Sequence, residues 1–291
     1  MTQLDPRTEA RSAPVAQTDG DVRAALTFIV PQDTKPYFES AALTGGVPKV
    51  HFRTEDRAVA IRDMRPMRDT LSLDRQGFEL HRHDTTVDNF YDNDAVDELY
   101  RRELETLLKE ITGADRVVVF DYTRRSDGPS GAAHRQRSRT PANRVHVDYT
   151  VTSGPKRARD VLGAEVFERV VGKGGRIVQV NAWRPIKGPV QRAPLALGDA
   201  QSLKSNELIA TDQIFPDRVG EIYHVAHGPE QRWYWAPLMQ RDEVILIKGW
   251  DSLDDGRARF TPHGAFHLSS ETSDTPARES IEARTYLIFD A

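Results

Sequence analysis

The sequence predicts a mainly β fold, a β-sandwich, jelly roll or barrel, with two helices packed outside it. The second half of the chain contains many short apolar segments, and turn residues such as Gly, Pro and Asp-Ser separate them. Such a succession of short strands is typical of two-sheet and barrel architectures. Because no fixed-period repeat and no clear linker interrupts the 291 residues, we expect one domain over residues 22–291, preceded by a disordered leader at 1–21.

Composition excludes several classes of protein. Apolar residues make up 38% of the chain and charged residues 29%, with a net charge of −4, which is an ordinary globular balance. This charge provides no field that would recruit nucleic acid, and no apolar run is long enough to span a bilayer. We therefore expect neither a nucleic-acid partner nor a membrane partner. Since the first 21 residues lack the apolar core of a signal peptide, a cytoplasmic location is expected.

The chain contains no cysteine, which excludes disulfides, Fe–S clusters, cysteine nucleophiles and thiolate zinc sites. A metal site would have to use His, Asp, Glu and water. These ligands suit Fe(II), Mn(II) or a hydrolytic zinc ion.

Apolar residues at helical spacing predict a helix over residues 94–112, with Asp94 as N-cap and Gly113 after its end. A second amphipathic helix is expected over 156–171. Between them, residues 116–122 are typical of a buried strand, and the basic, Ser- and Gly-rich residues 123–140 are expected to form a mobile loop.

The remaining expected elements are mainly strands. Residues 59–64 alternate as a strand would, residues 71–80 predict a strand or turn, and residues 31–57 predict irregular structure. Further strands are expected at 144–151, 176–183, 195–197, 221–227, 233–236, 243–250, 259–266 and 281–289.

One short motif can carry metal chemistry. In a strand, residues i and i+2 point to the same face, so His146 and Asp148 would project side by side and could share a metal ion. Two ligands on one strand, with a third from elsewhere, match a 2-His-1-carboxylate triad, which leaves coordination positions open. Taken alone, a His-x-Asp tripeptide indicates a surface His–Asp pair more often than a metal site.

A third ligand could be one of four downstream histidines, namely His224, His227, His263 and His267. Alternation along a strand does not separate His263 from His267, because their spacing is even. Arg278, fifteen residues after His263, lies just before the last expected strand. Such a guanidinium could grip a carboxylate in a bidentate fork, here the distal carboxylate of 2-oxoglutarate, whereas the alternative is a surface salt bridge with its neighbour Glu279.

Longer motifs resemble the CmcJ/NvfI family, also called the AsaB or gibberellin-desaturase-like family. The resemblance runs from about residue 59 to residue 289. Its motifs are Gly77-Phe-Glu-Leu80, Thr112-Gly-Ala-Asp-Arg-Val-Val-Val-Phe-Asp-Tyr-Thr-Arg-Arg125, Val145-His-Val-Asp-Tyr-Thr150, Val180-Asn-Ala-Trp-Arg-Pro-Ile186, Pro194-Leu-Ala-Leu-Gly-Asp-Ala200, Trp233-Tyr-Trp-Ala-Pro237, Asp242-Glu-Val-Ile-Leu-Ile-Lys248, Trp250-Asp-Ser252, Pro262-His-Gly-Ala-Phe266 and Arg278-Glu-Ser-Ile-Glu-Ala-Arg284.

The resemblance implies a distorted double-stranded β-helix (a jelly roll of cupin-like type) and a non-haem dioxygenase that uses Fe(II), 2-oxoglutarate and O₂. It places the distal ligand in Pro-His-x-Ala-Phe, which selects His263 over His267. It further implies hydroxylation or desaturation of a small molecule of secondary metabolism, and a homodimer. Family members often have Cys where this chain has Gly198, and the basic stretch at 124–139 is longer than usual.

Other polar residues are assigned provisional roles. Arg278, Ser280, Asn181 and Arg184 are expected to contact the cosubstrate, although a structural hydrogen bond explains Asn181 and Arg184 equally well. Tyr122 and Arg124 are expected at the substrate entrance. The alternatives to the oxygenase are a cupin-like metal-dependent isomerase or hydrolase, and a catalytically inactive partner subunit of a biosynthetic complex.

Overall fold

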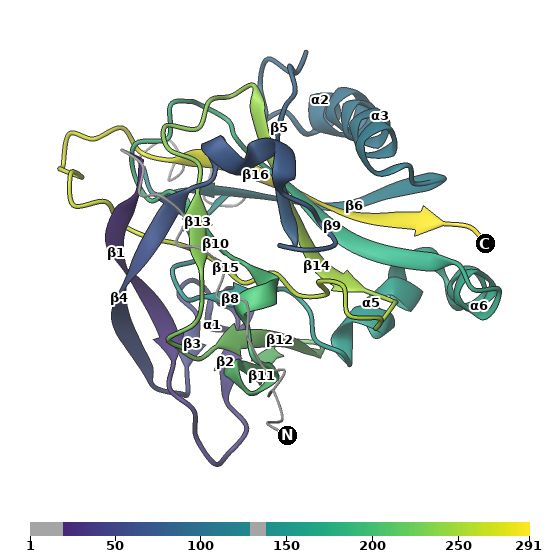
Figure 1. The fold of residues 1–291 in the computed structure, drawn as a ribbon, viewed down its shortest axis with the longest axis horizontal. Helices are drawn as coiled ribbons and strands as arrows, with labels where there is room; N and C mark the ends of the chain where they lie inside the picture. Colours follow the sequence, from purple (N-terminus) through teal and green to yellow (C-terminus); the bar gives the residue numbers. More distant parts are fainter. Residues whose placement is uncertain (1–19, 129–137) are drawn as a thin grey trace, which may run out of the picture.

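Two β-sheets form the framework of the chain, whose computed structural model describes residues 20–128 and 138–291 (Figure 1). In these ranges the larger sheet has ten strands. Their order is β1 (Val22–Ile29), β4 (Thr54–Asp63), β13 (Trp233–Trp235), β10 (Leu195–Gly198), β15 (His263–Ala265), β8 (His146–Val147), β12 (Val219–Val225), β11 (Leu208–Ile214), β2 (Tyr37–Glu39) and β3 (Lys49–Val50).

The smaller sheet has six strands in the described ranges, and its three central strands are long and antiparallel. Their order is β5 (Phe78–Arg82), β14 (Glu243–Asp251), β9 (Arg176–Pro185), β16 (Glu279–Phe289), β6 (Arg116–Ser126) and β7 (Ser138–Arg139). The expectation of a mainly β, jelly-roll type fold is confirmed.

The alternation of side chains along β14 shows how the layers pack. Ile245 and Ile247 face the larger sheet and join a core cluster with its Leu197, whereas Val244 and Leu246 face the other way. That outer face is covered by a helical segment whose leucines complete a second cluster. The inner face of the smaller sheet therefore looks across the core at the larger sheet, and the site described below lies between them.

The expected helix over 94–112 consists of three consecutive pieces beside β6 and β16 (Figure 1). These are α2 (Asn93–Ala95), a π-helical turn (Val96–Tyr100) and α3 (Arg101–Thr112). The N-cap is Asp92 rather than Asp94, because the Asp92 side chain accepts the backbone N–H groups of Asp94 and Ala95. Gly113 ends the helix with φ 71°, as expected.

The expectation of one helix over 156–171 is wrong. Two helices, α5 (Ser153–Leu162) and α6 (Ala164–Gly172), meet at Gly163, whose φ of 85° breaks the helical path. Both pack with Trp250 against inner-face residues of β9 and β16, at one end of the two sheets. Shorter helical segments elsewhere are α1 (Ala41–Thr44) and 3-10 turns at Arg65–Thr70, Ala200–Ser202 and Ser205–Glu207.

Several strand boundaries differ from those expected. Strand β8 is far shorter than 144–151, because Thr150 and Ser153 exchange hydrogen bonds in the turn that starts α5. The sequence analysis missed β1 and β11, and β2 and β3 lie in the segment expected to be irregular. Strand β6 extends through the first residues of the expected loop.

Two expectations fall mainly outside the described residues. These are the disordered leader, for residues 1–19, and the mobile basic loop, for residues 129–137. The last residues of the expected leader are ordered, since the carbonyl of Gly20 accepts a hydrogen bond from Nε1 of Trp235 at 2.9 Å. In the described ranges, no helix has the length and apolar composition needed to cross a membrane.

Candidate metal and cosubstrate site

His146, Asp148 and His263 come together between the two sheets, with ligand atoms within 4.8 Å of one another. His146 and His263 are directly paired across the neighbouring strands β8 and β15, so their rings lie side by side, 4.5 Å apart between centroids. Asp148 follows the end of β8 and places Oδ1 3.6 Å from Nε2 of His146. The chain thus brings together the three residues expected as metal ligands.

Both imidazoles are oriented by the backbone. Nδ1 of His146 lies 2.9 Å from the carbonyl oxygen of Arg144, and Nδ1 of His263 lies 3.1 Å from that of Thr261. A carbonyl accepts only from a protonated nitrogen, so Nδ1 of each ring carries a proton and Nε2 is the ring nitrogen that remains for a metal ion. Hydrogen bonding of the second ring nitrogen is the usual arrangement of a metal-binding histidine.

The carboxylate of Asp148 is held from the opposite sheet. Its Oδ2 accepts a hydrogen bond from Nδ2 of Asn181 at 2.8 Å and from Nε of Arg284 at 3.2 Å. Asn181 is fixed in turn, because its Oδ1 accepts from Nε2 of Gln179 at 2.6 Å. These bonds occupy Oδ2 and leave Oδ1 toward the histidines.

The environment keeps the site in its ligating protonation state. Burial, together with the neighbouring His263, lowers the pKa of His146 to about 3. Burial alone would raise the pKa of Asp148, but the charge of Arg284 and the two histidines outweigh burial and hold it well below its usual range. At neutral pH His146 is therefore a neutral imidazole and Asp148 an ionised carboxylate, as metal binding requires.

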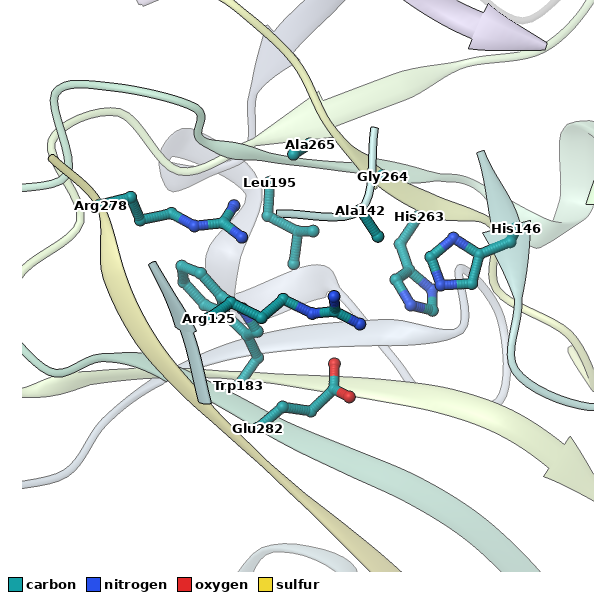
Figure 2. Close-up of a pocket in the computed structure, with 10 residues that line it drawn as sticks. All are labelled: Arg125, Ala142, His146, Trp183, Leu195, His263, Gly264, Ala265, Arg278 and Glu282. Carbon is teal, nitrogen blue, oxygen red and sulfur yellow. The ribbon is translucent and has the colours of Figure 1, made fainter. Parts of the chain in front are cut away.

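A pocket adjoins the two histidines and extends to Arg278 (Figure 2). Its lining residues are Arg125, Ala142, His146, Trp183, Leu195, His263, Gly264, Ala265, Arg278 and Glu282. Arg278 is 3% exposed, its guanidinium lies over the ring of Trp183, and its Nε has no hydrogen-bond partner in the described residues. Burial lowers the pKa of Arg278 to about 9, and Arg125 adds to this shift. A buried guanidinium that forms no ion pair with a carboxylate of the described residues is suited to an anionic ligand.

Of the residues expected to contact the cosubstrate, some point into the interior between the sheets and one points to the opposite face of its strand. Ser280 is buried in β16 and lies two residues before Glu282, which lines the pocket. Asn181 points to the same interior, but its side-chain amide is hydrogen-bonded to Asp148 and Gln179. Arg184, three residues further along β9, belongs to the opposite face and donates to the backbone oxygen of His83 at 2.8 Å.

Tyr122 and Arg124 do not line the pocket. Tyr122 packs in the cluster beneath α3, and Nε of Arg124 donates to the carbonyl of Phe90. The cause is a bulge in β6: Val119 pairs with Thr285 and Asp121 with Arg284, so Phe120 is an extra residue. A bulge of this kind inverts the alternation of all residues after it.

The sequence analysis missed three residues of the interior. Arg125 lines the pocket because the bulge turns it inward. Glu282 and Arg284 form an ion pair within the sheet, with Nη2 of Arg284 2.9 Å from Oε1 of Glu282. The sequence does contain a signal for Glu282 and Arg284. Both are an even number of residues from Arg278, which places the three side chains on one face of the strand.

The other downstream histidines lie away from the triad. His267 is largely exposed, and its Nδ1 lies 2.7 Å from Oε2 of Glu271. His224 is paired across β8 with His146, but its buried ring packs against Phe38 and Phe52. His227 stacks edge-on with Phe28.

The donor set fits a hard or borderline divalent ion with open positions. Two imidazole nitrogens and one carboxylate oxygen match the 2-His-1-carboxylate arrangement of non-haem Fe(II) oxygenases. Arg278 at the other end of the pocket, whose Nε has no partner among the described residues, fits an organic anion that reaches from the metal position. The residues present therefore fit both an iron ion and a 2-oxo acid.

Comparisons with known proteins agree with this chemistry. A family model described as "Oxidoreductase/YMDC permease-like domain" matches residues 26–289. The chain is 34% identical to the hydroxylase/desaturase efuI of Hormonema carpetanum, over 84% of this chain and 88% of that protein. It is 30% identical to the α-ketoglutarate-dependent dioxygenase tstK of Talaromyces stipitatus, over 91% and 96% of the two chains. The solved structure of the iron and α-ketoglutarate-dependent endoperoxidase NvfI is similar with a TM-score of 0.80, at 25% identity, over 93% of this chain and 98% of that one.

Proposed function

Because the chain belongs to the CmcJ/NvfI family of Fe(II)/2-oxoglutarate-dependent oxygenases, we propose that His146, Asp148 and His263 hold its iron and that Arg278 anchors its cosubstrate. The chain is an oxidoreductase that uses Fe(II), 2-oxoglutarate and O₂. The observation that carries the proposal is the convergence of the three ligand atoms within 4.8 Å at one end of a pocket whose other end holds a buried arginine that forms no ion pair with the described residues.

Iron, once bound, supplies the activation of O₂ that is coupled to oxidative decarboxylation of 2-oxoglutarate to succinate and CO₂. The protein's own residues prepare this chemistry. The carbonyls of Arg144 and Thr261 fix the imidazoles so that Nε2 of each points to the metal position. Asn181 and Arg284 hold Asp148 so that one carboxylate oxygen remains for the metal.

Arg278 orients the cosubstrate in this proposal. Its guanidinium is buried against Trp183, where a charge-assisted hydrogen bond to a carboxylate is stronger than in water. Leu195, Trp183 and Ala265 form apolar walls of the pocket and limit the access of water. Ser280 lies near enough in the strand to assist Arg278.

We propose a small molecule of secondary metabolism as the substrate, with hydroxylation or desaturation of a C–H bond as the outcome. The relatives named hydroxylase/desaturase support this class of reaction. We also propose a homodimer in the cytoplasm. The absence of cysteine from the chain agrees with a reducing compartment.

The metal assignment is tested by His146→Ala, with His267→Ala as its matched control. His146→Ala should abolish both Mn(II) binding, followed by electron paramagnetic resonance, and succinate formation from 2-oxoglutarate. His267→Ala should retain both, because His267 is exposed and pairs with Glu271. Wild-type rates of succinate formation in His146→Ala would refute the assignment.

A further inference from the structure

Two guanidinium groups, those of Arg125 and Arg278, line the same pocket. Each donates to one backbone oxygen, Arg125 through Nη1 to Thr140 at 2.9 Å and Arg278 through Nη1 to Ala193 at 2.5 Å. An arginine has five N–H donors, so both keep donors for a ligand. In the described ranges, neither forms an ion pair with a carboxylate.

Glu282, the one carboxylate among the described residues that line this pocket, forms its ion pair with another arginine. Its Oε1 lies 2.9 Å from Nη2 of Arg284, which also binds Asp148 and thus belongs to the metal side of the site. Glu282 attracts both arginines electrostatically and Asp127 attracts Arg278, but among the described residues no carboxylate forms an ion pair with either guanidinium. Two partly or fully buried cations near each other are costly unless an anion joins them. The pocket is therefore matched to a ligand with two negative charges.

The placement of the two arginines matches the two ends of such a ligand. In Figure 2 the guanidinium of Arg125 lies between that of Arg278 and the rings of His146 and His263. Arg125 is held there because the bulge in β6 turns it inward, where it pairs across the strands with Ser280. A 2-oxo diacid that reaches from the metal position to Arg278 passes Arg125 with its first carboxylate.

We infer that Arg125 is a second cosubstrate-binding residue, which donates to the 1-carboxylate of 2-oxoglutarate while Arg278 takes the 5-carboxylate. This inference rests on the proposed function. One oxygen of the 1-carboxylate binds the metal together with the 2-oxo group, and the other oxygen remains as the acceptor for Arg125. The two arginines then divide recognition: Arg125 serves any 2-oxo acid, and Arg278 selects the acid that carries a second carboxylate.

The experiment compares two 2-oxo acids in the wild type and four variants under anaerobic conditions with Fe(II). The acids are 2-oxoglutarate and 2-oxopentanoate, which lacks the 5-carboxylate, and binding is followed by the visible metal-to-ligand band, so no turnover is needed. The proteins are the wild type, Arg125→Gln, Arg278→Gln and the control Arg116→Gln, which carries the same change on the same strand but pairs with Asp290 outside the pocket. Thermal unfolding verifies that each variant is folded, and Arg125→Lys provides a second variant that keeps the charge.

Arg125→Gln should weaken binding of both acids by the same factor, roughly tenfold to a hundredfold, as expected for the loss of a charge-assisted hydrogen bond. Arg278→Gln should weaken only 2-oxoglutarate and so remove the preference between the acids, whereas Arg116→Gln should match the wild type. Arg125→Lys should lie between Arg125→Gln and the wild type.

Other outcomes separate the hypotheses. Unchanged binding of 2-oxoglutarate by Arg125→Gln would overturn the inference while leaving the proposed function intact. Weakening of 2-oxoglutarate alone would assign Arg125 to the 5-carboxylate and also overturn it. The absence of a band with 2-oxoglutarate in the wild type would refute the proposed function itself.

Discussion

Nε of Arg284 lies 3.2 Å from Oδ2 of Asp148, so the carboxylate of the triad is shared between the metal position and a buried guanidinium of the opposite sheet. Arg284 also lies 2.7 Å from Asp121 and 2.9 Å from Glu282. Together these attractions outweigh burial and hold the pKa of Arg284 well above its ordinary value. A single arginine thus joins three carboxylates behind the metal site, and its removal would leave them to repel one another.

Arg284→Gln should therefore destabilise the chelator-treated protein by about 3–5 kcal/mol, the typical cost of removing one partner from a buried ion pair. Addition of Mn(II) should recover more stability in this variant than in the wild type, because the metal replaces the lost positive charge beside Asp148. Urea unfolding with and without Mn(II) measures both effects. Equal recovery in the two proteins would contradict the electrostatic role of Arg284.

Asn181→Ala should weaken metal binding by roughly tenfold to a hundredfold, the usual effect of losing a hydrogen bond to a metal ligand. Its amide holds Oδ2 of Asp148 at 2.8 Å, and its loss allows the carboxylate to rotate. Mn(II) titration measures the affinity, and Asn206→Ala, at an exposed position, serves as control. An affinity equal to that of the control would show that Arg284 alone orients Asp148.

The stability of the chelator-treated protein should decrease as the pH falls from about 6.5 toward 3. Burial lowers the pKa of His146 from 6.5 to about 3, so between these values the unfolded chain binds a proton that the folded chain does not. The stabilisation is complete above pH 6.5 and lost by pH 3. His146→Gln lacks this group, so its unfolding free energy should fall less steeply between pH 6 and 4, as measured by urea unfolding. Parallel pH profiles for the two proteins would rule out a lowered pKa of His146.

Gly77→Ala should weaken metal binding indirectly, by displacing Thr261 and with it His263. Gly77 has φ +89°, and an added Cβ would collide with Oγ1 of Thr261, whose carbonyl orients His263. Gly113→Ala is the matched control, because Gly113 has φ +71° but open space around it. Both variants should lose roughly 1–3 kcal/mol of stability from the backbone conformation, but only Gly77→Ala should also lose Mn(II) affinity. Equal affinities would show that Thr261 accommodates the methyl group without moving His263.

The metal triad could be predicted from the sequence because its information is local. His146 and Asp148 are two residues apart, and the Pro-His-x-Ala-Phe motif singled out His263 where strand alternation could not. The two histidines are brought together by the pairing of His146 with His263 across neighbouring strands. The position of Arg278 at the start of the last strand was recognisable for the same reason.

The residues of β6 that line the pocket could not be predicted, because a bulge determines which side chains of this strand point inward. Unbroken alternation from Val117 would have turned Tyr122 and Arg124 inward, but the extra residue Phe120 turns Arg125 inward instead. The bulge is defined by register against β16, which lies about 160 residues away along the chain. The prediction of a single helix over 156–171 was wrong for a related reason. The amphipathic pattern continues on both sides of Gly163, although the backbone breaks the helix there.

The division of the site between two sheets makes the ligands a link between separate parts of the architecture. Both imidazoles belong to the ten-stranded sheet, whereas Asn181, Arg284 and Arg278 extend from the six-stranded sheet. Any partly unfolded form in which the sheets separate would keep the histidine pair but lose the support of Asp148 and the anchor for the organic anion. Bound metal and cosubstrate should therefore stabilise the association of the two sheets. During refolding, the visible band of their complex would appear when the sheets come together.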